Sequence, residues 1–220
     1  MRISNIKLVI GVPLSYHLIP TAFFDSFITM EKPDFIYIRT SNGGIEMMRN
    51  GIVKQALEGK CTHLVMMDTD QCYHPETITR LLSHRLPVVG ALVYRRYPPF
   101  DPLMMRGEIG KYLNVMEWEP NSLVEVDATG TGCLMFDMNV FRKMPPPWFR
   151  IRHHVGEGHT GTVGEDFGFC SDLRKAGYKI YVDTSVPVGH LSQLQITEDI
   201  WRLFGKLNAV KNNEQKENEK

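Results

Sequence analysis

The chain has no excess of either charge, no closely spaced cysteines and no long apolar run. Lysine plus arginine number 25, as do aspartate plus glutamate, so no overall basic field marks a nucleic-acid-binding protein. The four cysteines form no CxxC pair, which argues against a zinc ribbon or a disulfide framework. No stretch approaches the roughly 18 apolar residues of a membrane span, and the apolar run at 6–10 is too short for a signal peptide. We therefore expect a cytoplasmic protein with reduced thiols.

The order of hydrophobic patterns predicts a single α/β domain. Of 220 residues, 43% are hydrophobic, which is enough for a substantial core. Short apolar runs alternate with segments of helical periodicity, as in a mostly parallel central sheet flanked by helices. Strands are expected at 6–12, 35–39, 63–67, 88–94, 131–137 and 179–183, and helices at 45–57, from 75 onward and from 165 to 177.

We assign residues 1–210 to this domain. The last ten residues, 211–220, contain no apolar side chain and are expected to form a disordered polar tail. Residues 95–122 are irregular, and a hairpin between 111–118 and 123–126 is expected beside them.

Residues 144–164, which are rich in proline, glycine and histidine, are expected to form a long loop. Three interpretations of it stay open. The first is a lid that excludes water from a bound donor, the second is a separate zinc site made by its histidines, and the third is a plain flexible loop.

An Asp-x-Asp motif directly follows one predicted strand. Asp68 and Asp70 come after the apolar run 64–67. Open α/β sheets bind ligands at the carboxyl ends of their strands, and hard divalent cations take carboxylates together with substrate phosphates. The motif therefore indicates a divalent-cation site, and a solvated turn is the alternative.

Two further features supply candidate site residues. Glu165 and Asp166 begin a predicted helix, where the macrodipole favours ionised carboxylates that can accept a proton from an attacking hydroxyl. His190 follows the last predicted strand, and imidazole with carboxylate suits Mn²⁺ better than Mg²⁺. The alternative for Glu165 and Asp166 is simple helix capping. The alternative for His190 is a structural role.

Taken in order, these features resemble the family-2-like glycosyltransferases with a GT-A fold, from about Ile6 to His190. The resemblance also includes a small-Pro turn after the first strand (9–13), an Arg-Asn pair in a helix (49–50) and a glycine-rich strand start (127–136). It implies a Mn²⁺- or Mg²⁺-dependent enzyme that moves a sugar from a UDP- or GDP-sugar to an acceptor hydroxyl. A carboxylate base favours inversion at the anomeric carbon.

The resemblance also implies roles for single residues. The donor would be bound by Val12, Pro13, Arg49, Asn50, Asp68 and Arg95; the metal ligands would be Asp68, Asp70 and His190; the base would be Asp166 or, as second choice, Glu165. The chain departs from the family in two ways. Its second strand (36–41) ends without acidic residues, and it lacks a Gln-x-x-Arg-Trp element, which favours single transfer. Arg95 or Arg96 would replace the charge of that element near the diphosphate.

Other functions stay open at this point. A sugar-1-phosphate nucleotidyltransferase would generally carry a glycine-rich, basic loop after its first strand, whereas residues 11–17 hold one glycine and no lysine or arginine. A non-catalytic nucleotide-sugar-binding protein would keep the same pocket. Aromatic and basic residues interleave at 94–97 and 148–152, which suits either sugar stacking or nucleic-acid contact, so a hydroxymethylated DNA base stays open as acceptor.

Overall fold

The computed structural model describes residues 6–156 and 159–207, with side chains at 6–153 and 161–207. The helices are α1 (Thr21–Thr29), α2 (Ile45–Glu58), α3 (Thr77–Ser83), α4 (Asn139–Lys143) and α5 (Glu165–Lys175). The strands are β1 (Leu8–Pro13), β2 (Phe35–Thr40), β3 (His63–Met67), β4 (Gln71–Cys72), β5 (Val88–Val93), β6 (Met104–Arg106), β7 (Leu113–Asn114), β8 (Leu123–Val126), β9 (Ala128–Thr129), β10 (Cys133–Asp137), β11 (Arg152–Gly156), β12 (His159–Val163) and β13 (Ile180–His190).

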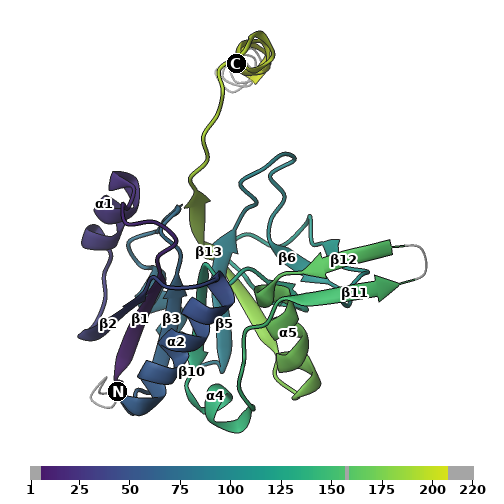
Figure 1. The fold of residues 1–220 in the computed structure, drawn as a ribbon. Coiled ribbons are helices and arrows are strands. Elements are labelled where there is room, and N and C mark those ends of the chain that lie inside the picture. Colours follow the sequence, from purple (N-terminus) through teal and green to yellow (C-terminus); the bar gives the residue numbers. More distant parts are fainter. Residues whose placement is uncertain (1–5, 157–158, 208–220) are drawn as a thin grey trace.

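A central sheet of eight strands organises the molecule (Figure 1). Its order is β2-β1-β3-β10-β5-β13-β4, and β8 also pairs with β13. Strands β2, β1, β3, β5 and β13 run in one direction, while β10 lies antiparallel between β3 and β5. The predicted α/β class with a mostly parallel sheet flanked by helices is confirmed.

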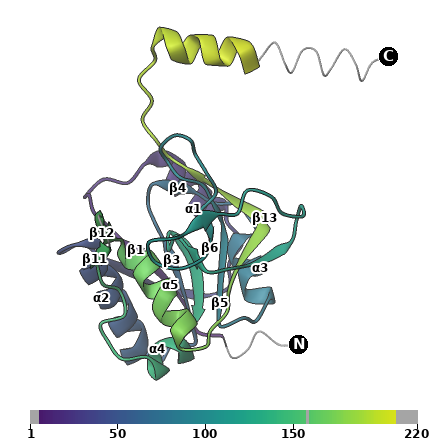
Figure 2. The same cartoon turned by 90° about the vertical axis from the view of Figure 1, so that its right-hand side faces the viewer.

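The sheet separates two apolar cores because successive strand residues point to opposite faces. In β1, Val9 packs with α2, α4 and α5, whereas Ile10 packs with α1 and α3 on the other face. In β3, Leu64 belongs to the same core as Val9, and Val65 belongs to the same core as Ile10. Figures 1 and 2 show the helices on the two sides of the sheet. Burial on both faces explains why the central strands read as continuous apolar runs.

Helix α2 forms where the periodicity predicts it. Its inward face buries Ile52, Val53 and Ala56 completely against the sheet. The helix begins after Gly44, and no side chain caps its first turn.

Two sequence expectations about irregular segments were wrong. Residues 111–118 and 123–126 form no hairpin with each other, because β7 pairs with β6 and β8 pairs with β13. Much of the expected 144–164 loop is instead a two-stranded hairpin of β11 and β12. Threonine and valine in 152–163 favour strands, and that local signal was outweighed by the glycines and histidines of the segment and the prolines before it. The expected tail at 211–220 lies outside the described residues.

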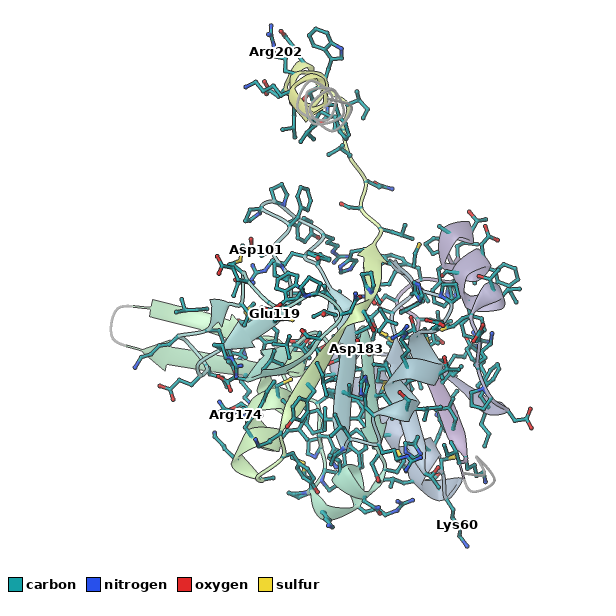
Figure 3. All side chains as sticks on the ribbon, turned by 180° about the vertical axis from the view of Figure 1, so that it is seen from behind. Lys60, Asp101, Glu119, Arg174, Asp183 and Arg202 are labelled. Carbon is teal, nitrogen blue, oxygen red and sulfur yellow. The ribbon has the colours of Figure 1, made fainter. Side chains whose placement is uncertain are left out.

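A helix at 198–207 stands away from the body after an extended segment that leaves β13 (Figures 1 and 2). Figure 3 shows Arg202 on this helix, far from Asp183, which lies within the body. Among the residues described, no helix has the length and apolar character needed to cross a bilayer.

An aromatic cluster anchors α5, whose first turn carries Glu165 and Asp166. Phe169 is fully buried, with its ring centroid 4.6 Å from that of Phe149 and 5.5 Å from that of Phe141. We expect Phe169→Ala to lower the free energy of unfolding by about 3–5 kcal/mol, because the lost contacts leave a cavity.

Chemical denaturation monitored by circular dichroism measures this loss. Phe24→Ala, at a half-exposed position on α1, is the matched control and should cost under about 1 kcal/mol. Equal effects of the two substitutions would contradict the anchoring role of the cluster.

Candidate active site at the carboxyl edge of the sheet

Strand register brings His190 beside the Asp-x-Asp motif. Asp68 follows β3 directly, and the short strand β4 then pairs antiparallel with the end of β13, so that His190 lies opposite Gln71. The backbone N–H of Leu191 donates to the Asp70 carbonyl at 2.7 Å. Backbone hydrogen bonds therefore fix two segments that lie far apart in the sequence at one edge of the sheet.

The side chains of Asp70 and His190 face each other. His190 Nε2 lies 3.3 Å from Asp70 Oδ2, and His190 Nδ1 lies 2.8 Å from the carbonyl oxygen of Tyr94. A carbonyl only accepts, so Nδ1 carries a proton and donates it. In the neutral imidazole, the lone pair of Nε2 then points at a carboxylate, which is also an acceptor.

Charge and hydrogen bonding shift both groups toward their ionised forms. Burial opposes ionisation of Asp70, but the hydrogen bond and charge of His190 and the charge of Arg96 outweigh it and lower the pKa of Asp70. Burial also disfavours the imidazolium, yet the hydrogen bonds to Asp70 and Tyr94 raise the pKa of His190. Protonated His190 and ionised Asp70 thus form an ion pair, and a metal ion would have to replace the proton on Nε2.

Arg49 joins the Asp-x-Asp motif to helix α5. Its Nη2 donates to both oxygens of Asp68, at 3.0 and 3.1 Å, and its Nη1 donates to Glu165 Oε1. The Arg49 side chain is only 5% exposed. Burial lowers the pKa of Arg49, but the neighbouring carboxylates outweigh this and raise it, so the guanidinium is charged.

Asp166 lies next to this cluster and lines a cleft of about 590 Å³. Its Oδ1 accepts from the backbone N–H of Phe167 at 2.7 Å. Burial raises the pKa of Asp166, which Arg49 only partly offsets. A raised pKa makes a carboxylate a stronger base. Other lining residues include Tyr97, Tyr112 and His190, so the cleft reaches from the α5 start to the Asp70–His190 pair.

The position of Asp68 is fixed from several sides. Its backbone N–H donates to the Gly132 carbonyl at 3.0 Å, and the Tyr73 hydroxyl donates to the Asp68 carbonyl at 2.7 Å. A Cβ on Gly132 would overlap Gln71 Nε2 and lie 2.8 Å from Asp68 Oδ2, so a larger residue there would push both side chains aside. The lack of a side chain at Gly132 thus leaves room for Asp68 and Gln71.

Three buried side-chain atoms without a hydrogen-bond partner among the described residues are Arg49 Nε, Gln71 Oε1 and Thr131 Oγ1. Arg49 binds Asp68, and Gln71 and Thr131 flank Asp70 and Gly132 in sequence. Buried polar atoms are rarely left unpaired, so these three atoms are suited to bind water or a polar ligand.

The remaining predicted donor-binding residues divide into two groups. Val12 and Pro13 end β1 at the same edge of the sheet, beside β3. Arg95 lines the cleft. Asn50 does not, because its amide donates to the carbonyls of Glu46 and Phe149 and accepts from two backbone N–H groups at 148 and 149. Asn50 therefore secures the segment before β11, and its expected contact with a donor is not supported.

Asp70 and His190 fit a divalent cation, whereas the full predicted ligand trio is not assembled. Two ligand atoms of one octahedral ion, each about 2.1 Å from it, lie about 3 Å apart, close to the observed 3.3 Å. Both Asp68 oxygens are bound to Arg49, and the described part of the chain holds no group of three acidic, histidine or cysteine side chains arranged for a metal. An ion here would depend on phosphate oxygens or water for its other ligands.

No protein-family model matches the chain, and no curated protein matches its sequence. Solved structures match its fold. A197 from STIV has a TM-score of 0.59 at 15% identity, covering 86% of this chain and 87% of that chain. GalNAc-T7, crystallised with UDP, GalNAc and Mn²⁺, has a TM-score of 0.52 at 12% identity, covering 86% of this chain and 44% of that chain.

The fold is GT-A-like. S. aureus TarS matches with a TM-score of 0.48 at 14% identity, covering 83% of this chain and 60% of that chain. At these identities the likeness concerns the fold, which is the one that the sequence predicted.

Sequence reasoning missed two features of the site. Arg95 and Arg96 were both named as a possible charge near the diphosphate, but the contact of Arg96 with Asp70, at 2.7 Å, was not predicted. The bridging role of Arg49 was also missed, because Glu165 lies 116 residues away. The sequence predicted donor binding by Arg49, and in the structure its guanidinium binds Asp68 and Glu165.

We expect removal of Arg49 to destabilise the fold through its unpaired carboxylates. Arg49→Met should cost about 3 kcal/mol, because it leaves the buried Glu165 and the partly buried Asp68 without a countercharge. The double variant Arg49→Met/Glu165→Gln should be more stable than the sum of the single losses by about 1–2 kcal/mol. Urea denaturation of the wild type and the three variants measures this coupling, and strictly additive losses would contradict the bridge.

Proposed function

We propose that this chain is a metal-dependent glycosyltransferase that transfers a sugar from a UDP- or GDP-sugar to an acceptor hydroxyl. The observation that carries the proposal is the close approach of Asp70 and His190, 3.3 Å apart, at the carboxyl edge of a GT-A-like sheet. Beside the pair lies a cleft lined by a carboxylate, Asp166. The fold shared with GalNAc-T7, a glycosyltransferase crystallised with UDP, GalNAc and Mn²⁺, supports it.

The proposed donor site lies along the ends of β1 and β3. Asp70 and His190 would hold Mn²⁺, or less readily Mg²⁺, together with diphosphate oxygens. When bound, the ion supplies Lewis-acid stabilisation of the negative charge on the departing diphosphate. Val12 and Pro13 would border the nucleoside. Asp68, held by Arg49, would face the ribose or a ligand of the ion.

Asp166 is the proposed general base. Its carboxylate accepts the proton of the acceptor hydroxyl, whose oxygen forms a bond to the anomeric carbon while the bond from that carbon to the diphosphate oxygen breaks. The nucleoside diphosphate leaves from the opposite face, so the configuration inverts. Glu165 is less suited because Arg49 donates to its carboxylate. Tyr97, Tyr112 and Phe167 line the cleft and offer faces for an acceptor ring.

A thermal-shift panel of nucleoside diphosphates and nucleotide sugars, each with and without Mn²⁺, tests the donor class. A ligand that binds the native state raises the melting temperature by mass action. We expect a stabilising nucleotide sugar whose effect depends on Mn²⁺. No shift with any nucleotide in the presence of Mn²⁺ would contradict the proposal.

We expect Asp166→Asn to separate binding from turnover. The amide is nearly isosteric but cannot accept the acceptor proton, so the transfer rate should fall by about 10²–10⁴-fold while the Kd for the donor stays within about twofold. Single-turnover transfer assays with the donor found by thermal shift measure both. Asp199→Asn, on the exposed helix at 198–207, is the matched control.

Retained turnover in Asp166→Asn would remove that residue from the base role. Donor binding without transfer to any acceptor in the wild type would favour the non-catalytic nucleotide-sugar-binding protein instead.

A further inference from the structure

The two acidic side chains of the Asp-x-Asp motif are neutralised by two arginines in very different surroundings. Arg49, paired with Asp68, has a side chain that is 5% exposed. Arg96, paired with Asp70, has a side chain that is 46% exposed. A buried charge pair is costly to break, whereas a solvent-exposed pair is worth little and opens easily.

Arg96 donates to the carboxylate oxygen that the candidate cation would need. Its Nη1 lies 2.7 Å from Asp70 Oδ2, and that same oxygen faces His190 Nε2 at 3.3 Å. A guanidinium and a divalent cation on the same carboxylate repel each other and draw on the same lone pairs. An ion held by Asp70 and His190 would therefore bind more tightly once Arg96 has moved away from Oδ2.

The segment that carries Arg96 has a defined backbone. The N–H of Arg95 donates to the Asp101 carbonyl at 2.9 Å, and the N–H of Phe100 donates to the Tyr97 carbonyl at 2.9 Å. The Arg96 guanidinium also lies 5.2 Å from the centroid of the Tyr97 ring. Arg96 lines the same cleft, and its exposed side chain has room to rotate away from Asp70 without a change in the backbone.

We propose that Arg96 is an exchangeable countercharge that holds Asp70 until a divalent cation arrives and then pairs with the diphosphate of the donor. The inference rests on the proposed function. Arginine suits the second step, since its planar fork binds phosphate oxygens with two parallel hydrogen bonds. Arg96 thus weakens binding of the ion alone and strengthens binding of the ion together with the diphosphate.

This dual role predicts changes of opposite sign in one variant. Arg96→Gln should bind Mn²⁺ about two- to fivefold more tightly, because an exposed competing ion pair is removed. At saturating Mn²⁺ it should bind inorganic pyrophosphate about tenfold more weakly, because a charged donor is lost. Titration calorimetry with Mn²⁺ alone, and with pyrophosphate in excess Mn²⁺, measures both constants on the full chain.

Arg106→Gln is the matched control. It removes the same charge from an exposed residue of β6 and should leave both constants within about twofold of the wild type. Circular dichroism melts of both variants check that the fold is retained.

Three results would overturn the inference, and they are distinguishable. Equal Mn²⁺ affinity in the wild type and Arg96→Gln would refute competition at Asp70 while leaving the metal site intact. Unchanged pyrophosphate affinity would refute the second step. Absence of Mn²⁺ binding in the wild type and Arg96→Gln, with and without pyrophosphate, would refute the proposed function and this inference together.

Discussion

The site depends on one buried guanidinium shared by two distant carboxylates. Arg49 lies on α2, yet it donates to Asp68 at the end of β3 and to Glu165 at the start of α5. Burying one cation with two anions stabilises the fold only while all three are present, because any of them alone would be an uncompensated charge. This contact therefore sets the position of α5, and with it the position of Asp166, relative to the edge of the sheet.

A division of charge follows from that arrangement. Asp68 is paired with a buried arginine, whereas Asp70 lies between His190 and the exposed Arg96. The backbone pairing of β4 with β13 holds Asp70 and His190 together. For the proposed function, such a frame would bind an ion and a diphosphate without reorganising the sheet.

Much of the fold could be predicted from sequence, because fully buried strands and amphipathic helices leave strong local patterns. The apolar run that ends at Met67 located Asp68 and Asp70 at a strand end, and Gly164 and Gly177 bracketed α5. Asp70 and His190 were correctly expected at one edge. The partners of Arg49 and Asn50 were not predictable, since both contacts span about a hundred residues and depend on how α5 and the segment at 148–149 pack. The β11–β12 hairpin was missed because its glycines and histidines resemble a loop.

Anomalous X-ray scattering from crystals soaked with Mn²⁺ and UDP would locate the ion that Asp70 and His190 are proposed to bind. We expect a single strong manganese peak within bonding distance of both an Asp70 carboxylate oxygen and His190 Nε2, with Asp68 still bound to Arg49. A peak elsewhere, or a manganese ion held by Asp68 after its separation from Arg49, would rule out this site.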